Sequence, residues 1–219
     1  NDDLVAVNPN DANHRAQNLG KTWGHVKRLH IEQLRAESAH SFVRLLSIDD
    51  PIEDVTINDL VGGCHVCAVN MDAARQCAVP VFAEDDPEYA EGAGMLRRVR
   101  ITDVDVHRAG GGNPKGLFHL MCNVERMIIE NVRRDGEHGT QPMPPTVSIE
   151  KVGRASLAVE GLTRSQVEAL VAEGLTEDLS VTPIVTPHGQ PRLRATAGVH
   201  VDSRFAIPHG GFDRLEINM

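Results

Sequence analysis

Four stretches of the chain repeat one pattern of apolar and polar residues, and this repeat limits the fold more than any other feature. Each has an apolar residue, two polar residues, an apolar residue, any residue, isoleucine, a polar residue, then Gln, Asp or Asn, and a closing Leu or Val. The stretches begin at Val26, Ile52, Leu96 and Val124, which are 26, 44 and 28 residues apart. The long spacing fits a repeat of ordinary length with an inserted loop. Such a period indicates a solenoid.

The alternation inside each stretch is typical of a β-strand. Leucine-rich repeats are shorter and dominated by leucine, and helical repeats would show a period of 3.6. The pattern therefore predicts an all-β fold, a right-handed parallel β-helix; a β-sandwich with accidental internal similarity is the alternative. Two stacked rows follow from the alignment. The inner row is Ile31, Ile57, Ile101 and Ile129, and the turn row is Gln33, Asp59, Asp103 and Asn131.

A second strand can be aligned in each coil. The pentapeptides "LVAVN" from Leu4 and "VCAVN" from Val66 are nearly the same, and "FVRLL" and "LFHLM" take the same place in their coils. With a period of two, this alignment predicts one buried row and one row that faces an exposed groove. The buried row would contain Val5, Val43, Cys67 and Phe118, and the groove row would contain Ala6, Arg44, Ala68, Asn70 and His119.

The repeat fades after Asn131, which suggests two parts. We expect residues 1–139 to form the coils and residues 140–219 to form a C-terminal cap and flank with one short helix over 163–174. Thr163 and Gln166 form a capping box at the start of that helix. A β-helix that begins without a cap would expose an open rung. We therefore expect further coils upstream of Asn1, or a homo-oligomer or second polypeptide that completes them.

Composition excludes several classes of protein. The net charge of −9 argues against a nucleic-acid binder, and no apolar run is long enough to cross a bilayer. The segment "CHVC" with Cys77 nearby invites a zinc site, but Cys64 and Cys67 would project from opposite faces of a strand. We favour buried, reduced cysteines and expect no metal and no cofactor. The acidic segment from Glu84 to Glu91 could bind calcium, but a solvated loop is the simpler interpretation.

Paired aspartates precede the first strand in "NDDLVAVN". In our alignment the residues equivalent to Asp3 in the later coils are Ser41, His65 and Gly116. Ser41 is preceded by His40, and Gly116 is preceded by Lys115. Neighbouring carboxylates can divide the work of acid and base, because ionisation of one opposes ionisation of the other. Asp2, Asp3 and His40 are therefore the candidate catalytic residues.

These motifs resemble those of the pectate-lyase superfamily, particularly the polygalacturonase-like glycoside hydrolases. That family carries an aspartate pair before an alternating strand and, one coil later, a Gly-His-Gly segment, which "SAHSFVRLLS" resembles in degenerate form. The resemblance implies that one of Asp2 and Asp3 protonates the leaving oxygen, that the other helps to activate water, and that His40 supports them. The family's Arg-x-Lys pair for a substrate carboxylate would fall at Ala68 and Asn70. A neutral glycan is thus as consistent with the sequence as a galacturonate.

Three functions remain open. The leading one is a glycoside hydrolase that acts on a polysaccharide or oligosaccharide, in a secreted or periplasmic setting. The second is a polysaccharide lyase, in which Lys115, Arg44 or a histidine would be the base. The third is a non-catalytic glycan-binding module of the tailspike or adhesin kind. The candidate substrate-binding residues are Arg44, His65, Asn70, Lys115 and His119.

Overall fold

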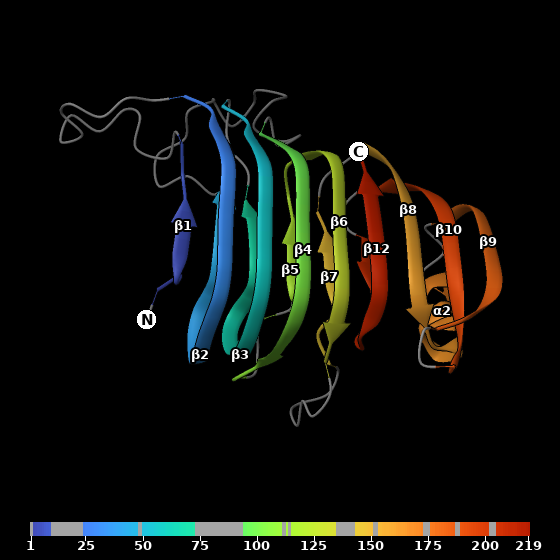
Figure 1. The fold of residues 1–219 in the computed structure, drawn as a ribbon. Coiled ribbons are helices and arrows are strands. Elements are labelled where there is room, and N and C mark those ends of the chain that lie inside the picture. Colours follow the sequence, from blue (N-terminus) through green and yellow to red (C-terminus); the bar gives the residue numbers. More distant parts are fainter. Residues whose placement is uncertain are drawn as a thin grey trace, which may run out of the picture.

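The computed structural model describes residues 2–9, 24–47, 50–72, 94–110, 113, 115–134, 143–150, 153–172, 176–186, 189–201 and 205–219. Apart from the helix α2 (Arg164–Ala172), the regular elements of these residues are strands, and the fold is all-β (Figure 1). The predictions for Cys77 and for the acidic segment 84–91 lie outside the described residues. The strands are β1 (Val5–Val7), β2 (Val26–Leu46), β3 (Ile52–Asp72), β4 (Met95–Arg108), β5 (Phe118–Leu120), β6 (Asn123–Arg133), β7 (Val147–Ile149), β8 (Gly153–Leu162), β9 (Thr176–Val185), β10 (Pro191–Val201), β11 (Phe205–Ile207) and β12 (Phe212–Asn218).

The described strands belong to one large mixed sheet. Pairing is parallel from β1 to β7: β1 with β2, β2 with β3, β3 with β4 and β5, β4 with β6, and β5 with β7. It is antiparallel where the later strands join, with β12 between β6 and β8, β10 between β8 and β9, and β11 beside β7. Figure 1 shows the ribbons of β2 and β3 turning at one end and running back behind their own first parts.

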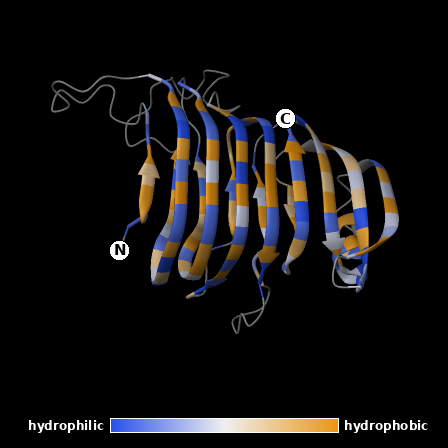
Figure 2. Cartoon of the chain, viewed as in Figure 1, coloured by the Kyte–Doolittle hydropathy of each residue, from blue (hydrophilic) through white to orange (hydrophobic). Residues whose placement is uncertain are grey.

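The four repeats stack in register, as the sequence predicted. Ile31 pairs with Ile57, Ile57 with Ile101, and Ile101 with Ile129. The last three of these isoleucines are fully buried, and Ile31, nearer the edge, is 6% exposed. Apolar bands therefore continue from strand to strand (Figure 2), and burial of these side chains is the main stabilising term of such a layer.

Two positions in every repeat have a left-handed backbone. One is the predicted turn row, in which Gln33, Asp59, Asp103 and Asn131 have φ values between 53° and 61°. The other lies five residues earlier and was not predicted: Arg28, Asp54, Arg98 and Arg126, with φ between 52° and 58°. A positive φ breaks the simple alternation, so the strand bends and the apolar residues on both sides of the bend still face inward.

The second strand of each repeat carries one correction to the predicted register. Val5 pairs with Val43 as expected, but Val43 pairs with Val69 and not with Cys67, and Val69 in turn pairs with Phe118. A shift of two residues keeps every side chain on its own face, so the apolar pattern could not detect the error. Gly62 lies before the second part of β3 and requires glycine. Its φ is 126°, and a Cβ there would lie 1.8 Å from the carbonyl oxygen of Ala36.

Beyond the repeats, the predicted boundary at residue 139 falls in a segment outside the described residues. Parallel pairing extends past it to β7, and β12 then adds to β6 in the opposite direction. The predicted helix forms as α2, and its capping box is present: the Thr163 amide donates to Gln166 Oε1 at 2.9 Å, and the Gln166 amide donates to Thr163 Oγ1 at 3.3 Å. No helix in the described part of the chain is both long enough and apolar enough to cross a membrane.

A row of alternating charge crosses the four repeats. Lys27, Glu53, Arg97 and Glu125 occupy successive paired positions. Glu53 is 6% exposed and accepts hydrogen bonds from Arg97 and Arg98, each at 3.0 Å. Burial by itself raises the pKa of Glu53, but the bond from Arg98, the charge of Lys27 and the bond from Arg97 outweigh it and lower the pKa.

Candidate functional site

The two aspartates at the start of the chain lie beside His40. Pairing of β1 with β2 continues into this segment, where the Leu4 amide donates to the Ser41 carbonyl at 3.0 Å and the His40 amide donates to the Asp2 carbonyl at 3.4 Å. His40 Nδ1 then lies 3.2 Å from Asp3 Oδ1. The structure thus brings together the three residues that the sequence singled out as catalytic.

The groups of this cluster are close enough to act as a unit. One ligand atom from each of Asp2, Asp3 and His40 lies within 4.8 Å of the other two. Asp2 Oδ1 accepts a hydrogen bond from the Asp3 amide at 2.9 Å, and the side chain of Asp3 is 9% exposed while that of His40 is 47% exposed. Such a set can transfer protons. Two carboxylates and an imidazole are also donors that divalent metal ions accept, and among the described residues these three have the geometry for it.

His65 lies near this cluster but not in the predicted position. Because β3 is shifted by two residues, Cys67 and not His65 pairs with Ser41. His65 Nε2 instead lies 2.6 Å from Ser38 Oγ, on the strand that carries His40. The prediction that His65 continues the row from Asp3 is therefore wrong, although its side chain remains at the same end of the second strands.

Lys115 is linked to His65 through the guanidinium of Arg108. Arg108 donates to the His65 carbonyl at 2.8 Å and to the Lys115 carbonyl at 2.5 Å. These bonds hold the backbone at both residues, and the Lys115 side chain is half-buried. The role of Arg108 was not predicted, because a single arginine at the end of a strand has no distinguishing pattern.

The row predicted to face an exposed groove shows the same shift of two residues, since Asn70 takes the place predicted for Ala68, and most of it is buried. Arg44 pairs with Asn70, and Asn70 pairs with His119. Asn70 is 6% exposed and His119 is fully buried. Arg44 Nε donates to Asp72 Oδ2 at 2.6 Å, and His119 Nδ1 lies 2.8 Å from Ser148 Oγ. The prediction of an exposed groove along this row is wrong, because Asn70, Asp72 and His119 are buried.

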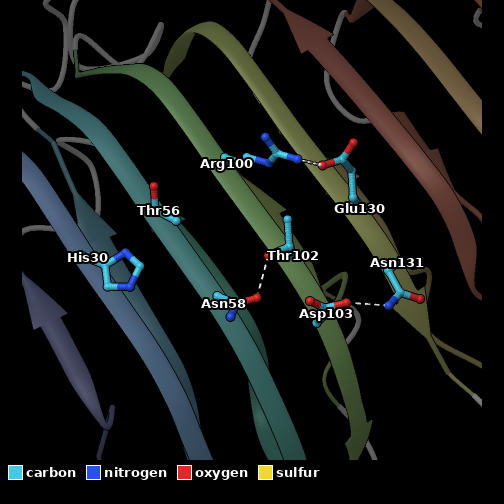
Figure 3. A pocket seen from close by; sticks show the side chains of 8 residues that line it. All are labelled: His30, Thr56, Asn58, Arg100, Thr102, Asp103, Glu130 and Asn131. Atoms are coloured by element: carbon cyan, nitrogen blue, oxygen red, sulfur yellow. Dashed lines mark hydrogen bonds and ion pairs between the residues drawn. The ribbon is translucent and has the colours of Figure 1, made fainter.

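A shallow polar pocket lies on the outer face of the repeats, and the sequence analysis missed it. It encloses about 580 Å³ and crosses β2, β3, β4 and β6 (Figure 3). We call it the outer pocket. Its lining is His30, Thr56, Asn58, Arg100, Thr102, Asp103, Glu130 and Asn131.

The lining residues of the outer pocket belong to successive repeats and lie on paired positions. Thr102 Oγ1 donates to Asn58 Oδ1 at 2.7 Å, and Asn131 Nδ2 donates to Asp103 Oδ1 at 2.5 Å. A third bond joins Arg100 to Glu130 Oε2 at 2.7 Å. Figure 3 shows these bonds running across the strands. The sequence feature that could have indicated this pocket is the two positions on either side of each stacked isoleucine. These positions point outward and are mostly polar.

Comparison with known proteins adds no family to this description. The chain matched no family model, and searches of the curated proteins and of the solved structures returned no match either.

Proposed function

We propose that this chain is a glycoside hydrolase in which Asp2 and Asp3 supply the acid and the base. The observation that supports the proposal is the contact of His40 Nδ1 with Asp3 Oδ1 at 3.2 Å, within a cluster whose third member is Asp2. Hydrolysis of a glycosidic bond uses two carboxyl groups, one to protonate the leaving oxygen and one to act as base or nucleophile. The cluster joins the segment before β1 to a residue of β2 that is 37 positions later in the chain.

The contacts suggest different roles for the two aspartates. His40 Nδ1 lies 3.2 Å from Asp3 Oδ1 and so orients this carboxyl group, which suits Asp3 as the base that activates water. Asp2 is the more exposed carboxyl group, so it suits the role of the acid that meets the leaving oxygen. His40 then acts as a positioning residue, since its contact is with Asp3 and not with the sugar.

We also propose that the repeats form a parallel β-helix. Four repeats that pair in parallel over two separate strands, with stacked isoleucines and left-handed corners, favour a right-handed parallel β-helix. In that architecture, ends of strands from successive coils lie side by side, and Asp2, Asp3, His40, Ser38 and His65 would share one such edge. A carbohydrate polymer is the substrate class that suits an elongated edge of this kind, and secretion or export to the periplasm would give access to it.

Substitution of each aspartate tests the proposed reaction. Asp2→Asn and Asp3→Asn should each lower turnover of the polysaccharide that the wild-type chain cleaves by about two to four orders of magnitude, the range for loss of one proton-transfer group. Asp105→Asn, at an exposed carboxylate of β4, is the matched control and should keep full activity. Thermal unfolding should be nearly the same for all three variants, because amide and carboxylate are close in shape.

Product analysis separates hydrolysis from the alternative reaction. Elimination by a lyase leaves an unsaturated sugar that absorbs ultraviolet light, whereas hydrolysis releases a reducing end without that absorbance. Products that absorb would replace the hydrolase with a lyase. Full activity of both asparagine variants, or no cleavage of any polysaccharide by the wild-type chain, would reject the roles given to Asp2 and Asp3.

A further inference from the structure

We infer that the outer pocket binds a neutral, linear oligosaccharide, separately from the Asp2, Asp3 and His40 cluster. The two sites share no residue. The pocket uses His30 in the first part of β2, before the bend, while the cluster uses His40 in its second part. The inference therefore adds a binding function to the proposed catalytic one and does not depend on it.

The shape of the outer pocket suits a chain-like ligand. Its lining comes from four strands that pair side by side, so equivalent polar groups repeat at the spacing between strands of about 4.8 Å. Asn58 and Thr102 occupy paired positions in neighbouring strands, and Thr56 and Arg100 form a second such pair. A ligand with polar groups at regular intervals can therefore contact successive repeats when it lies across the strands.

The side chains are held in place before a ligand arrives. Thr102 is bonded to Asn58, Asn131 to Asp103, and Arg100 to Glu130. Each of these groups keeps further capacity: Asn58 retains both amide hydrogens, and Asp103 retains its second oxygen. Side chains that are already ordered lose less entropy on binding, which favours affinity.

The chemistry of the lining selects hydroxyl groups. Hydroxyls both donate and accept, and the pocket offers carboxylates, amides, hydroxyls and a guanidinium that match either role. Asp103 would repel an anionic ligand, and the guanidinium of Arg100 already pairs with Glu130, which also pairs with Arg214. A neutral glycan satisfies these conditions, whereas a polyuronate or a nucleic acid does not.

Calorimetric titration tests the inference with defined probes. The full chain is titrated with cellohexaose, xylohexaose, mannohexaose and maltohexaose as neutral ligands, and with hexagalacturonate as the acidic one. At least one neutral hexaose should bind, and hexagalacturonate should bind more weakly. Asn58→Ala and Arg100→Gln should each weaken binding about tenfold, since each removes hydrogen bonds to the ligand. Asp105→Asn, outside the pocket on β4, should bind as the wild-type chain does.

A catalytic variant separates this inference from the proposed hydrolysis. Asp3→Asn should bind the neutral hexaose with unchanged affinity while it loses turnover. Asn58→Ala should bind the hexaose more weakly and should keep its turnover of a short soluble substrate. Unchanged thermal unfolding of Arg100→Gln would show that weaker binding reflects the pocket and not the fold. The inference fails if no neutral hexaose binds, if hexagalacturonate binds more tightly, or if both pocket variants bind as the wild-type chain does.

Discussion

Gln33 and Asp59 occupy the same corner of neighbouring strands, and both have a left-handed backbone, with φ values of 59° and 61°. Their flanking residues pair directly, Glu32 with Asn58 and Leu34 with Leu60. The corner therefore repeats as a structural unit, and its conformation is one that few residue types adopt without cost.

The effect of a substitution at this corner on the free energy of unfolding should depend strongly on the shape of the new side chain. Gln33→Asn should leave the free energy of unfolding unchanged or raise it, because asparagine tolerates a positive φ. Gln33→Val should lower it by about 1–2 kcal/mol, because a β-branched side chain is strained there. Glu32→Val is the matched control at the preceding, extended residue. Urea denaturation measures all three, and equal losses for the two valine variants would contradict the assignment of a strained corner.

The register of the first strands could be predicted because one repeat length governs them. The spacing of 26 residues between Ile31 and Ile57 also separates Val43 from Val69, and it would have identified the correct pairing. The similarity of two pentapeptides led to Cys67 instead. Both alternatives place apolar side chains inward, so hydrophobicity alone could not decide between them.

The outer pocket could not be predicted from residues considered one at a time. Thr56, Asn58 and Thr102 are ordinary polar residues on the outward face of a strand, where solubility alone explains them. These side chains lie together because β3 and β4, whose repeats begin 44 residues apart, pair in parallel. By contrast, the cluster at Asp2 and Asp3 was recognisable from its motif, although the alignment did not predict the burial of Asn70 and His119.

Acid should weaken the fold through Glu53. Its pKa in the folded chain lies below the ordinary value of 4.5, because burial, which opposes ionisation, is outweighed by Arg98, Lys27 and Arg97. A lowered pKa contributes stability that is present above the unfolded pKa and is lost as the pH falls through the folded pKa. The melting temperature of the wild-type chain should therefore be higher than that of Glu53→Gln at neutral pH. This difference in melting temperature should disappear at acidic pH.

Thermal melts over a range of pH measure this difference for Glu53. Glu37→Gln, at an exposed carboxylate of β2, is the control and should change the pH dependence less, because water screens an exposed charge. A difference between wild type and Glu53→Gln that persists unchanged into acid would show that the stabilisation by Glu53 does not require its charge.

Cys67 should be protected from alkylation in the folded chain. The thiol is fully buried, and burial raises its pKa to about 12. Its Sγ also lies 3.4 Å from the Gly116 carbonyl oxygen. Since the thiolate is the reactive form, iodoacetamide at mildly alkaline pH should leave Cys67 unmodified, while the chain in urea should be labelled. Peptide mass spectrometry measures the outcome, and rapid labelling of the folded chain would show that β3 and β5 separate readily.

The ion pair of Arg44 and Asp72 should be worth far more than an ion pair on the outer face. Arg44 Nε donates to Asp72 Oδ2 at 2.6 Å, and the Asp72 side chain is 3% exposed. Arg44→Met should lower the free energy of unfolding by about 3–5 kcal/mol, because it leaves a buried carboxylate without its cation. Arg44→Met combined with Asp72→Leu should recover much of this loss, since no uncompensated charge remains.

The matched control for the buried pair is Arg100→Met, which removes one of the two arginines, Arg100 and Arg214, that pair with Glu130. The Arg100 side chain is 61% exposed, so this loss should be below about 1 kcal/mol. Urea denaturation of the single and double variants gives the coupling between Arg44 and Asp72. If Arg44→Met costs no more than Arg100→Met, Asp72 must be reached by water, and the row that contains Arg44 would be open to solvent and available to a substrate after all.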